Sequence, residues 1–157
     1  MVTIKFDIKA LTAGLEQFAS DIQDHAVRSA AFAASKVLYE EMRLRAPRGK
    51  TGNLQSSIYQ HHDDKAANGV HIYAIGPNKQ RGKGNHWHLI EYGHWRTNVV
   101  IKLPNGQFMA TKTKLETPVW VPAKPFIRPT YDAKINQAID AAKQRLFDKV
   151  KELSDDA

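Results

Sequence analysis

The hydrophobic positions of the chain change period after the first few residues. Residues 2–8 alternate apolar and polar positions, which predicts a half-buried strand whose inward side chains are Val2, Ile4, Phe6 and Ile8. From Leu11 to Val37 the apolar residues recur every three or four positions, so the pattern predicts a long amphipathic helix over residues 11–45. Pro47 must end this helix, because proline lacks the N–H that a helix needs.

Short elements separated by turns are predicted for the middle of the chain. Thr51 is expected to cap a short helical turn that carries Leu54 and Ile58 into the core. A strand follows around residues 70–74, and residues 78–85 form a polar loop that contains glycine. Residues 86–93 predict a short helix that ends at Gly93.

Residues 98–112 predict a β-hairpin whose turn is Pro104-Asn105-Gly106, because Asn-Gly readily adopts the positive φ of tight hairpin turns. Beyond it, closely spaced prolines are expected to forbid regular structure until the last of them, which can occupy the first turn of a helix; they are Pro118, Pro122, Pro125 and Pro129. The final helix carries an apolar stripe at Ile135, Ile139, Ala142, Leu146 and Val150.

This order of elements predicts an α+β fold. We expect one antiparallel sheet packed against a long helix in the N-terminal half and a C-terminal helix, with a short inserted helix. At 157 residues the chain suits a single domain over 1–157, with a frayed tail at 154–157.

Composition narrows the class of protein without naming an activity. The chain has no cysteine, which excludes disulfides and thiolate chemistry. No apolar run is long enough to span a bilayer, and the N-terminus lacks the apolar block of a signal peptide, so we expect a cytoplasmic protein with no membrane contact. The net charge of +7 permits contact with DNA or an acidic partner, and the candidate residues are Lys79, Arg81, Lys83 and Arg96.

Two patterns suggest nucleotide or metal chemistry but lack the required spacing. Gly49-Lys50-Thr51 resembles the end of a phosphate-binding loop, yet position 44 is leucine where that loop needs glycine. His86, His88, Glu91 and His94 are zinc-type ligands, but they do not converge on one face of either a helix or a strand. His61 and His62 are interpreted as exposed polar residues at a strand end.

No residue pattern in the chain demands an enzyme. Ser56 and Ser57 lie on no nucleophile elbow, and Asp63-Asp64 fits a solvated turn better than a positioned acid and base. We therefore expect no catalytic residue, no cofactor and no metal. A metal-dependent hydrolase that uses His88, Glu91 and His94 stays a weaker alternative.

Aromatic residues gather in two segments that are also rich in aliphatic side chains. They are Trp87, Tyr92, Trp95, Trp120, Phe126 and Tyr131. Such residues can stack on single-stranded bases, but their apolar neighbours favour packing in the core or at a subunit interface.

Three segments taken together match a known family. They are APRGKTGNLQSSI at 46–58, HLIEYGHW at 88–95 and PAKPFIRPTYD at 122–132. Their order and spacing resemble the tail-completion proteins of long-tailed bacteriophages, the family typified by gene product ten of the HK-type lambdoid phages. The minor tail protein Z of lambda-like phages is functionally similar to that family. The resemblance covers about Leu11 to Leu146, and His94 departs from it, since a small hydroxyl residue usually follows the glycine.

The resemblance implies a structural virion protein that completes the tail tube or joins tail to head at the neck. Its partners would be the tail terminator, the head-completion or connector protein and the tail tube, and it would form a homo-oligomeric ring, close to DNA, on particles assembled in the host bacterial cytoplasm. The alternative is a basic nucleic-acid-binding module.

The structural motif and interface residues that the resemblance implies come from all three segments. They are Pro47, Thr51, Gly52, Leu54, Ile58, Glu91, Tyr92, Gly93, Pro125, Phe126, Arg128 and Pro129. Within this set Glu91 is expected to accept hydrogen bonds from neighbouring backbone or from Arg128, and Phe126 is expected to anchor the last helix.

Overall fold

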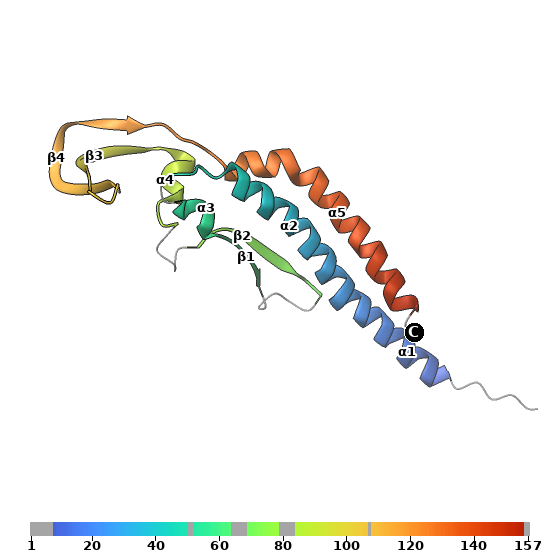
Figure 1. The fold of residues 1–157 in the computed structure, drawn as a ribbon. Helices are drawn as coiled ribbons and strands as arrows, with labels where there is room; N and C mark the ends of the chain where they lie inside the picture. The colour runs from blue at the N-terminus through green and yellow to red at the C-terminus, as the bar shows by residue number, and fades with distance from the viewer. Residues whose placement is uncertain (1–7, 50–51, 64–68, 79–83, 107, 156–157) are drawn as a thin grey trace, which may run out of the picture. The chain divides into compact units, whose positions relative to one another are not determined.

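The fold is α+β, as predicted, with the long helix in the N-terminal half, the C-terminal helix and the short inserted helix all present (Figure 1). The computed structural model describes residues 8–49, 52–63, 69–78, 84–106 and 108–155. The elements in chain order are α1 (Ile8–Asp21), η1 (Ile22–Ala26), α2 (Val27–Arg45), α3 (Asn53–Ser57), β1 (Ile58–Asp63), β2 (Ile72–Pro77), α4 (Trp87–Tyr92), β3 (His94–Lys102), β4 (Phe108–Val121) and α5 (Ile127–Asp155). The described strands form two separate two-stranded sheets, so the prediction of one sheet is wrong.

The long helix predicted over 11–45 consists of α1, the π-helical segment η1 and α2. It ends at Arg45, two residues before Pro47, which is the position that a following proline dictates. A π-helical turn inserts an extra residue into the helix, and Ala26 at the end of η1 is fully buried. Ile8 already belongs to α1, and the rest of the strand predicted over 2–8 lies outside the described residues.

Contacts divide the chain into two units, each of which draws on distant parts of the sequence. The first comprises Met1–Val37, His61–Ala74 and Asn136–Ala157. Inside it, Arg145 of α5 donates from Nε to Ser29 Oγ of α2 at 2.7 Å, and the rings of Phe32 and Tyr73 meet edge to face at 5.9 Å. Small buried side chains, Ala30 and Ala138, lie on the same two helices. The single domain over 1–157 stays a prediction.

The second unit, Leu38–Gln60 with Ile75–Ile135, contains a core built from three stretches of the sequence. Its buried members are Met42, Ala46, Leu54, Ile58 and Phe126. Gly52 precedes α3 with a φ of 61°, a left-handed conformation that glycine adopts without strain. Thr51, expected to cap this turn, lies outside the described residues.

Strands β3 and β4 form an antiparallel hairpin that follows directly on α4 (Figure 1). The turn lies at Pro104-Asn105-Gly106, as predicted. The N–H of Gly106 donates to the carbonyl of Leu103 at 2.8 Å, so Pro104 occupies the second position of the turn, where a type I turn prefers proline. The positive φ belongs to Gly106 (79°), not to Asn105, so this is not the tight Asn-Gly turn that the sequence suggested.

Strand β4 contains Pro118, so the prediction that the prolines forbid regular structure before Pro129 is wrong. Arg96 pairs with Val119 and Asn98 pairs with Lys114, so residues 115–118 of β4 lie opposite the single residue Thr97. This irregularity accommodates Pro118, because a proline at a bulge removes no ladder hydrogen bond. Pro129 does occupy the first turn of α5, as predicted.

Candidate functional site

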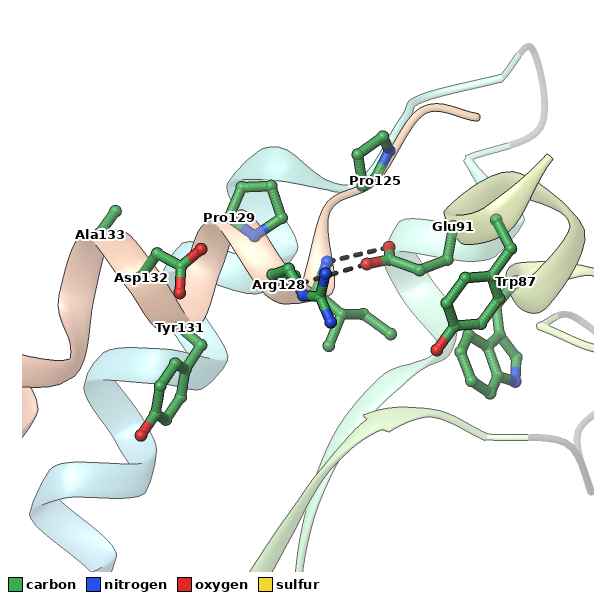
Figure 2. Close-up of a pocket in the computed structure, with 10 residues that line it drawn as sticks. Trp87, Glu91, Pro125, Arg128, Pro129, Tyr131, Asp132 and Ala133 are labelled. Carbon is green, nitrogen blue, oxygen red and sulfur yellow. Dashed lines mark hydrogen bonds between the residues drawn. The ribbon is translucent and has the colours of Figure 1, made fainter. Parts of the chain in front are cut away.

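Glu91 at the end of α4 binds the start of α5 through three backbone hydrogen bonds. Its Oε2 accepts from the N–H of Phe126 at 2.7 Å. Its Oε2 also accepts from the N–H of Ile127 at 3.1 Å, and its Oε1 accepts from the N–H of Arg128 at 3.2 Å (Figure 2). The first N–H groups of a helix have no partner inside the helix, and they carry partial positive charge. The carboxylate, only 7% exposed, supplies both the acceptors and the opposite charge. The contact to Arg128 is made by its backbone.

Phe126, the residue before α5, also stabilises the connection between α4 and α5. It is fully buried in the core of the second unit, and the hydroxyl of Thr130, also buried, donates to its carbonyl at 2.6 Å. The N–H of Lys124 donates to the carbonyl of Ile90 at 2.7 Å, which ties the approach to α5 to the helix that carries Glu91. We call residues 87–93 and 124–130 together the α4–α5 junction.

Gly93 occupies a position in the α4–α5 junction that no other residue fits. Its φ is 72°, in the region that favours glycine, and a Cβ placed there would lie 2.8 Å from Trp120 Cζ2 and 2.8 Å from the carbonyl oxygen of Val121. The backbone of β4 therefore approaches the end of α4 closely enough to exclude a side chain.

The structure brings the three sequence segments together. Leu54 and Ile58 from the first lie in the core with Phe126 from the third, and Glu91 from the second caps the helix that follows Phe126. The expectation that Glu91 bonds to neighbouring backbone therefore has a geometric basis. A role for these residues in an interface stays a prediction.

An open groove of about 1120 Å³ lies beside the α4–α5 junction (Figure 2). Figure 2 shows Glu91 and Trp87 on one side of it, with Arg128, Pro129, Tyr131 and Asp132 of α5 on the other. Tyr92 and Tyr131, 71% and 56% exposed, contribute aromatic surface that the sequence placed only in a general aromatic cluster. The lining residues are Trp87, Glu91, Tyr92, Pro125, Ile127, Arg128, Pro129, Tyr131, Asp132 and Ala133.

The β3–β4 ribbon, residues 94–121, leaves large apolar side chains exposed. Residues paired across an antiparallel ladder share a face, and neighbours along a strand alternate faces. The pairs Trp95–Trp120 and Ile101–Met109 therefore lie on one face, together with Thr97 and Val99 of β3. We call this the uncharged face, because none of its paired residues is charged; Lys112 and Glu116, in the stretches opposite Val99 and Thr97, have no paired position. Its four largest side chains are 62%, 47%, 42% and 48% exposed for Trp95, Trp120, Ile101 and Met109.

Of the residues predicted to contact DNA or an acidic partner, only Arg96 is described. It lies on β3, partly exposed, on the face opposite Trp95, and its buried Nε has no hydrogen-bond partner in the described part of the chain. Lys79, Arg81 and Lys83 lie outside the described residues.

Two of the four candidate zinc ligands, Glu91 and His94, make polar contacts with the backbone. Glu91 serves the backbone of α5, and His94 Nδ1 lies 3.4 Å from the carbonyl oxygen of Leu89. Across residues 8–49, 52–63, 69–78, 84–106 and 108–155, no group of three or more His, Cys, Asp or Glu side chains is arranged to hold a metal ion.

A histidine pair that the sequence did not reveal lies in the first unit. His62 Nε2 is 3.4 Å from His71 Nδ1, and His71 Nε2 is 3.6 Å from Asp24 Oδ1. The interpretation of His62 as exposed polarity is wrong, because it is partly buried between His71 and the ring of Tyr73. The pairing depends on the register of β1 and β2, which no local pattern signals.

A comparison with models of known protein families found a match to this chain. A family model described as "Bacteriophage HK97-gp10, putative tail-component" matches residues 9–93, more than half of the chain. The match contains the segment 46–58 and the Glu91-Tyr92-Gly93 motif, while the segment 122–132 lies beyond it. Searches of curated proteins and of solved structures found no match. Within the described residues, no helix has the length and hydropathy to cross a membrane.

Proposed function

The chain belongs to the HK97-gp10-like family of bacteriophage tail components, and from that premise we propose that it completes the tail tube or joins the tail to the head at the neck. The family match carries the proposal. It supports a structural component of a phage tail, and the finer role that we propose is a part added at the end of the tube. Such a role needs binding surfaces rather than a reaction centre.

Two exposed surfaces support a role in assembly. The uncharged face of the β3–β4 ribbon presents exposed tryptophan and methionine on paired positions that carry no charge, and such residues are enriched at interface centres. The groove beside the α4–α5 junction is lined mainly by apolar and aromatic residues. Large exposed apolar surfaces on soluble proteins usually mark contact sites.

These two surfaces differ from each other, which favours head-to-tail association. A contact between unlike patches on successive copies closes into a ring when the rotation allows. We propose that copies of this chain form such a ring on the particle, next to the tail terminator, the tail tube or the head connector. Tyr92, Pro125, Arg128 and Pro129 of the groove are the residues proposed for contact.

The function is tested by electron microscopy of lysates from a parent phage or prophage that lacks this gene, with the intact gene supplied in parallel. The proposal predicts filled heads separate from tails, or tails with abnormal length or ends, and it predicts normal particles on complementation. Normal infectious particles without the gene would refute it.

Self-association is measured separately by sedimentation of the purified protein, with and without isolated tails. A sedimentation coefficient that increases with concentration, or cosedimentation with tails, is expected. A protein that stays monomeric at every concentration, in the presence of tails as well, would rule out the ring.

A further inference from the structure

Three of the five charged residues of the β3–β4 ribbon share one face. Four of its residues are basic, Arg96, Lys102, Lys112 and Lys114, and one is acidic, Glu116, so residues 94–121 carry +3 of the chain's net +7. The pairing of Asn98 with Lys114 and the alternation along β3 place Arg96, Lys102 and Lys114 together. We call these three residues the basic face.

Lys102 and Lys114 are exposed, and Arg96 is partly exposed. The pairs with Lys102 and Arg96 also place Phe108 and Val119 on this face, 70% and 44% exposed, while Lys112 and Glu116 have no paired position. The six-residue separation of Arg96 and Lys102 corresponds to roughly 20 Å along an extended strand. The face therefore carries three cations spaced along the ribbon.

We propose that the basic face of the β3–β4 ribbon binds double-stranded DNA through its phosphates. Charge complementarity supports this partner: duplex DNA carries a negative charge about every 1.7 Å of its axis, so a line of cations can meet several phosphates at once. The opposite, uncharged face remains available for a protein neighbour. A polar side chain, Asn98, whose Nδ2 donates to the carbonyl of Thr111 at 2.8 Å, holds the two strands together between the cations.

The proposal does not depend on whether the chain completes the tail or joins it to the head. It concerns contact of the isolated protein with DNA, whereas the proposed function concerns the morphology of particles. A failure of one therefore leaves the other standing, and the two assays distinguish them.

The test measures binding of the whole chain to a mixed-sequence DNA duplex as a function of salt. With three phosphates contacted, the association constant should fall about 40-fold between about 50 and about 200 mM salt. The double variant Lys102→Gln/Lys114→Gln should bind more weakly, and the slope of log K against log salt should decrease by about 1.8.

The matched control is Lys143→Gln/Lys151→Gln, which removes the same charge from two exposed positions of α5 and should retain the slope. Thermal unfolding of both variants checks that they fold. Three outcomes would overturn the proposal: no binding of the intact protein at low salt, equal loss in both variants, or a preference for single strands that Trp95→Ala abolishes. The last result would indicate base stacking instead of phosphate contact.

Discussion

The α4–α5 junction and the β3–β4 ribbon are adjacent in the sequence, but Phe126 of the junction is buried whereas Trp95 and Trp120 of the ribbon are exposed. In the junction, Phe126 is fully buried and Glu91 satisfies three backbone N–H groups. In the ribbon, Trp95 and Trp120 form an edge-to-face pair at 5.3 Å and remain about half exposed. The contrast separates residues that hold the fold from residues that are available to a partner.

The ribbon is a separate two-stranded sheet, in which β3 and β4 pair with each other. A two-stranded hairpin alone is marginally stable in water, so its outer part gains most from a contact made on the particle. The close approach of Gly93 to Trp120 and Val121 fixes its base. Substitutions of the buried junction residues Glu91 and Phe126 should therefore reduce the free energy of unfolding, and substitutions on the uncharged face should reduce assembly.

Phe126→Ala should have the largest effect on stability. Removal of a fully buried phenylalanine leaves a cavity among Met42, Leu54 and Ile58, and such changes cost about 3–5 kcal/mol. Chemical denaturation measures the change. Trp95→Ala is the control, with a loss under about 1 kcal/mol. Equal losses would show that the ribbon tryptophan is as deeply packed in solution as Phe126, and would remove the contrast.

Gly93→Ala should destabilise more than Gly52→Ala. Gly52 has the left-handed φ of 61° and ψ of 11°, where another residue costs about 1–2 kcal/mol. Gly93 has a φ of 72° and a ψ of 171°, a region that is essentially restricted to glycine and costs about 1–3 kcal/mol. Only at Gly93 would the new methyl also meet Trp120 and the backbone of β4, at 2.8 Å, which adds about 1–3 kcal/mol of overpacking. Urea midpoints of the two variants give the comparison, and identical midpoints would contradict the close approach.

Glu91→Gln should destabilise by about 1–3 kcal/mol, because the amide loses the charge and turns a donor towards backbone N–H groups. Arg128→Ala should cost less than about 0.5 kcal/mol, since the bond from Arg128 is made by its backbone. Thermal unfolding distinguishes the two. A large loss of stability for Arg128→Ala would instead indicate that the Arg128 side chain forms an ion pair with Glu91.

Glu152→Gln should have the smallest effect. Hydrogen bonds from Lys149 and Arg145 hold the pKa of Glu152 below its usual value. A lowered folded pKa contributes stability above the unfolded pKa and loses it as the pH falls through the folded pKa. The variant should therefore unfold slightly earlier than the parent at neutral pH and alongside it at strongly acidic pH. A larger deficit at acidic pH would reverse the expected sign.

The elements that the sequence predicted correctly are those set by local chemistry. The end of the long helix before Pro47 follows from the missing N–H of proline, and the end of α4 at Gly93 follows from the positive φ that glycine tolerates. The hairpin was also predicted correctly. Its turn differs in type, because Gly106 rather than Asn105 has the positive φ.

The features that sequence reasoning missed depend on contacts between distant residues. The passage of β4 through Pro118 depends on extra residues opposite Thr97, which only the pairing with β3 reveals. The partners of Glu91 lie 35 to 37 positions later in the chain, and they are backbone groups that no residue pattern marks. The meeting of His62, His71 and Asp24 likewise needs the fold.

The central claim is that the uncharged face of the ribbon makes contacts on the particle, while the buried junction residues Glu91 and Phe126 stabilise the fold; complementation tests it most directly. A gene-deletion strain receives the variant Trp95→Ala/Met109→Ala, and its lysate is examined by electron microscopy beside one that receives the intact gene. The account predicts a folded variant with a near-normal unfolding midpoint and unfinished tails or unjoined heads. Normal infectious particles from the folded variant would contradict it.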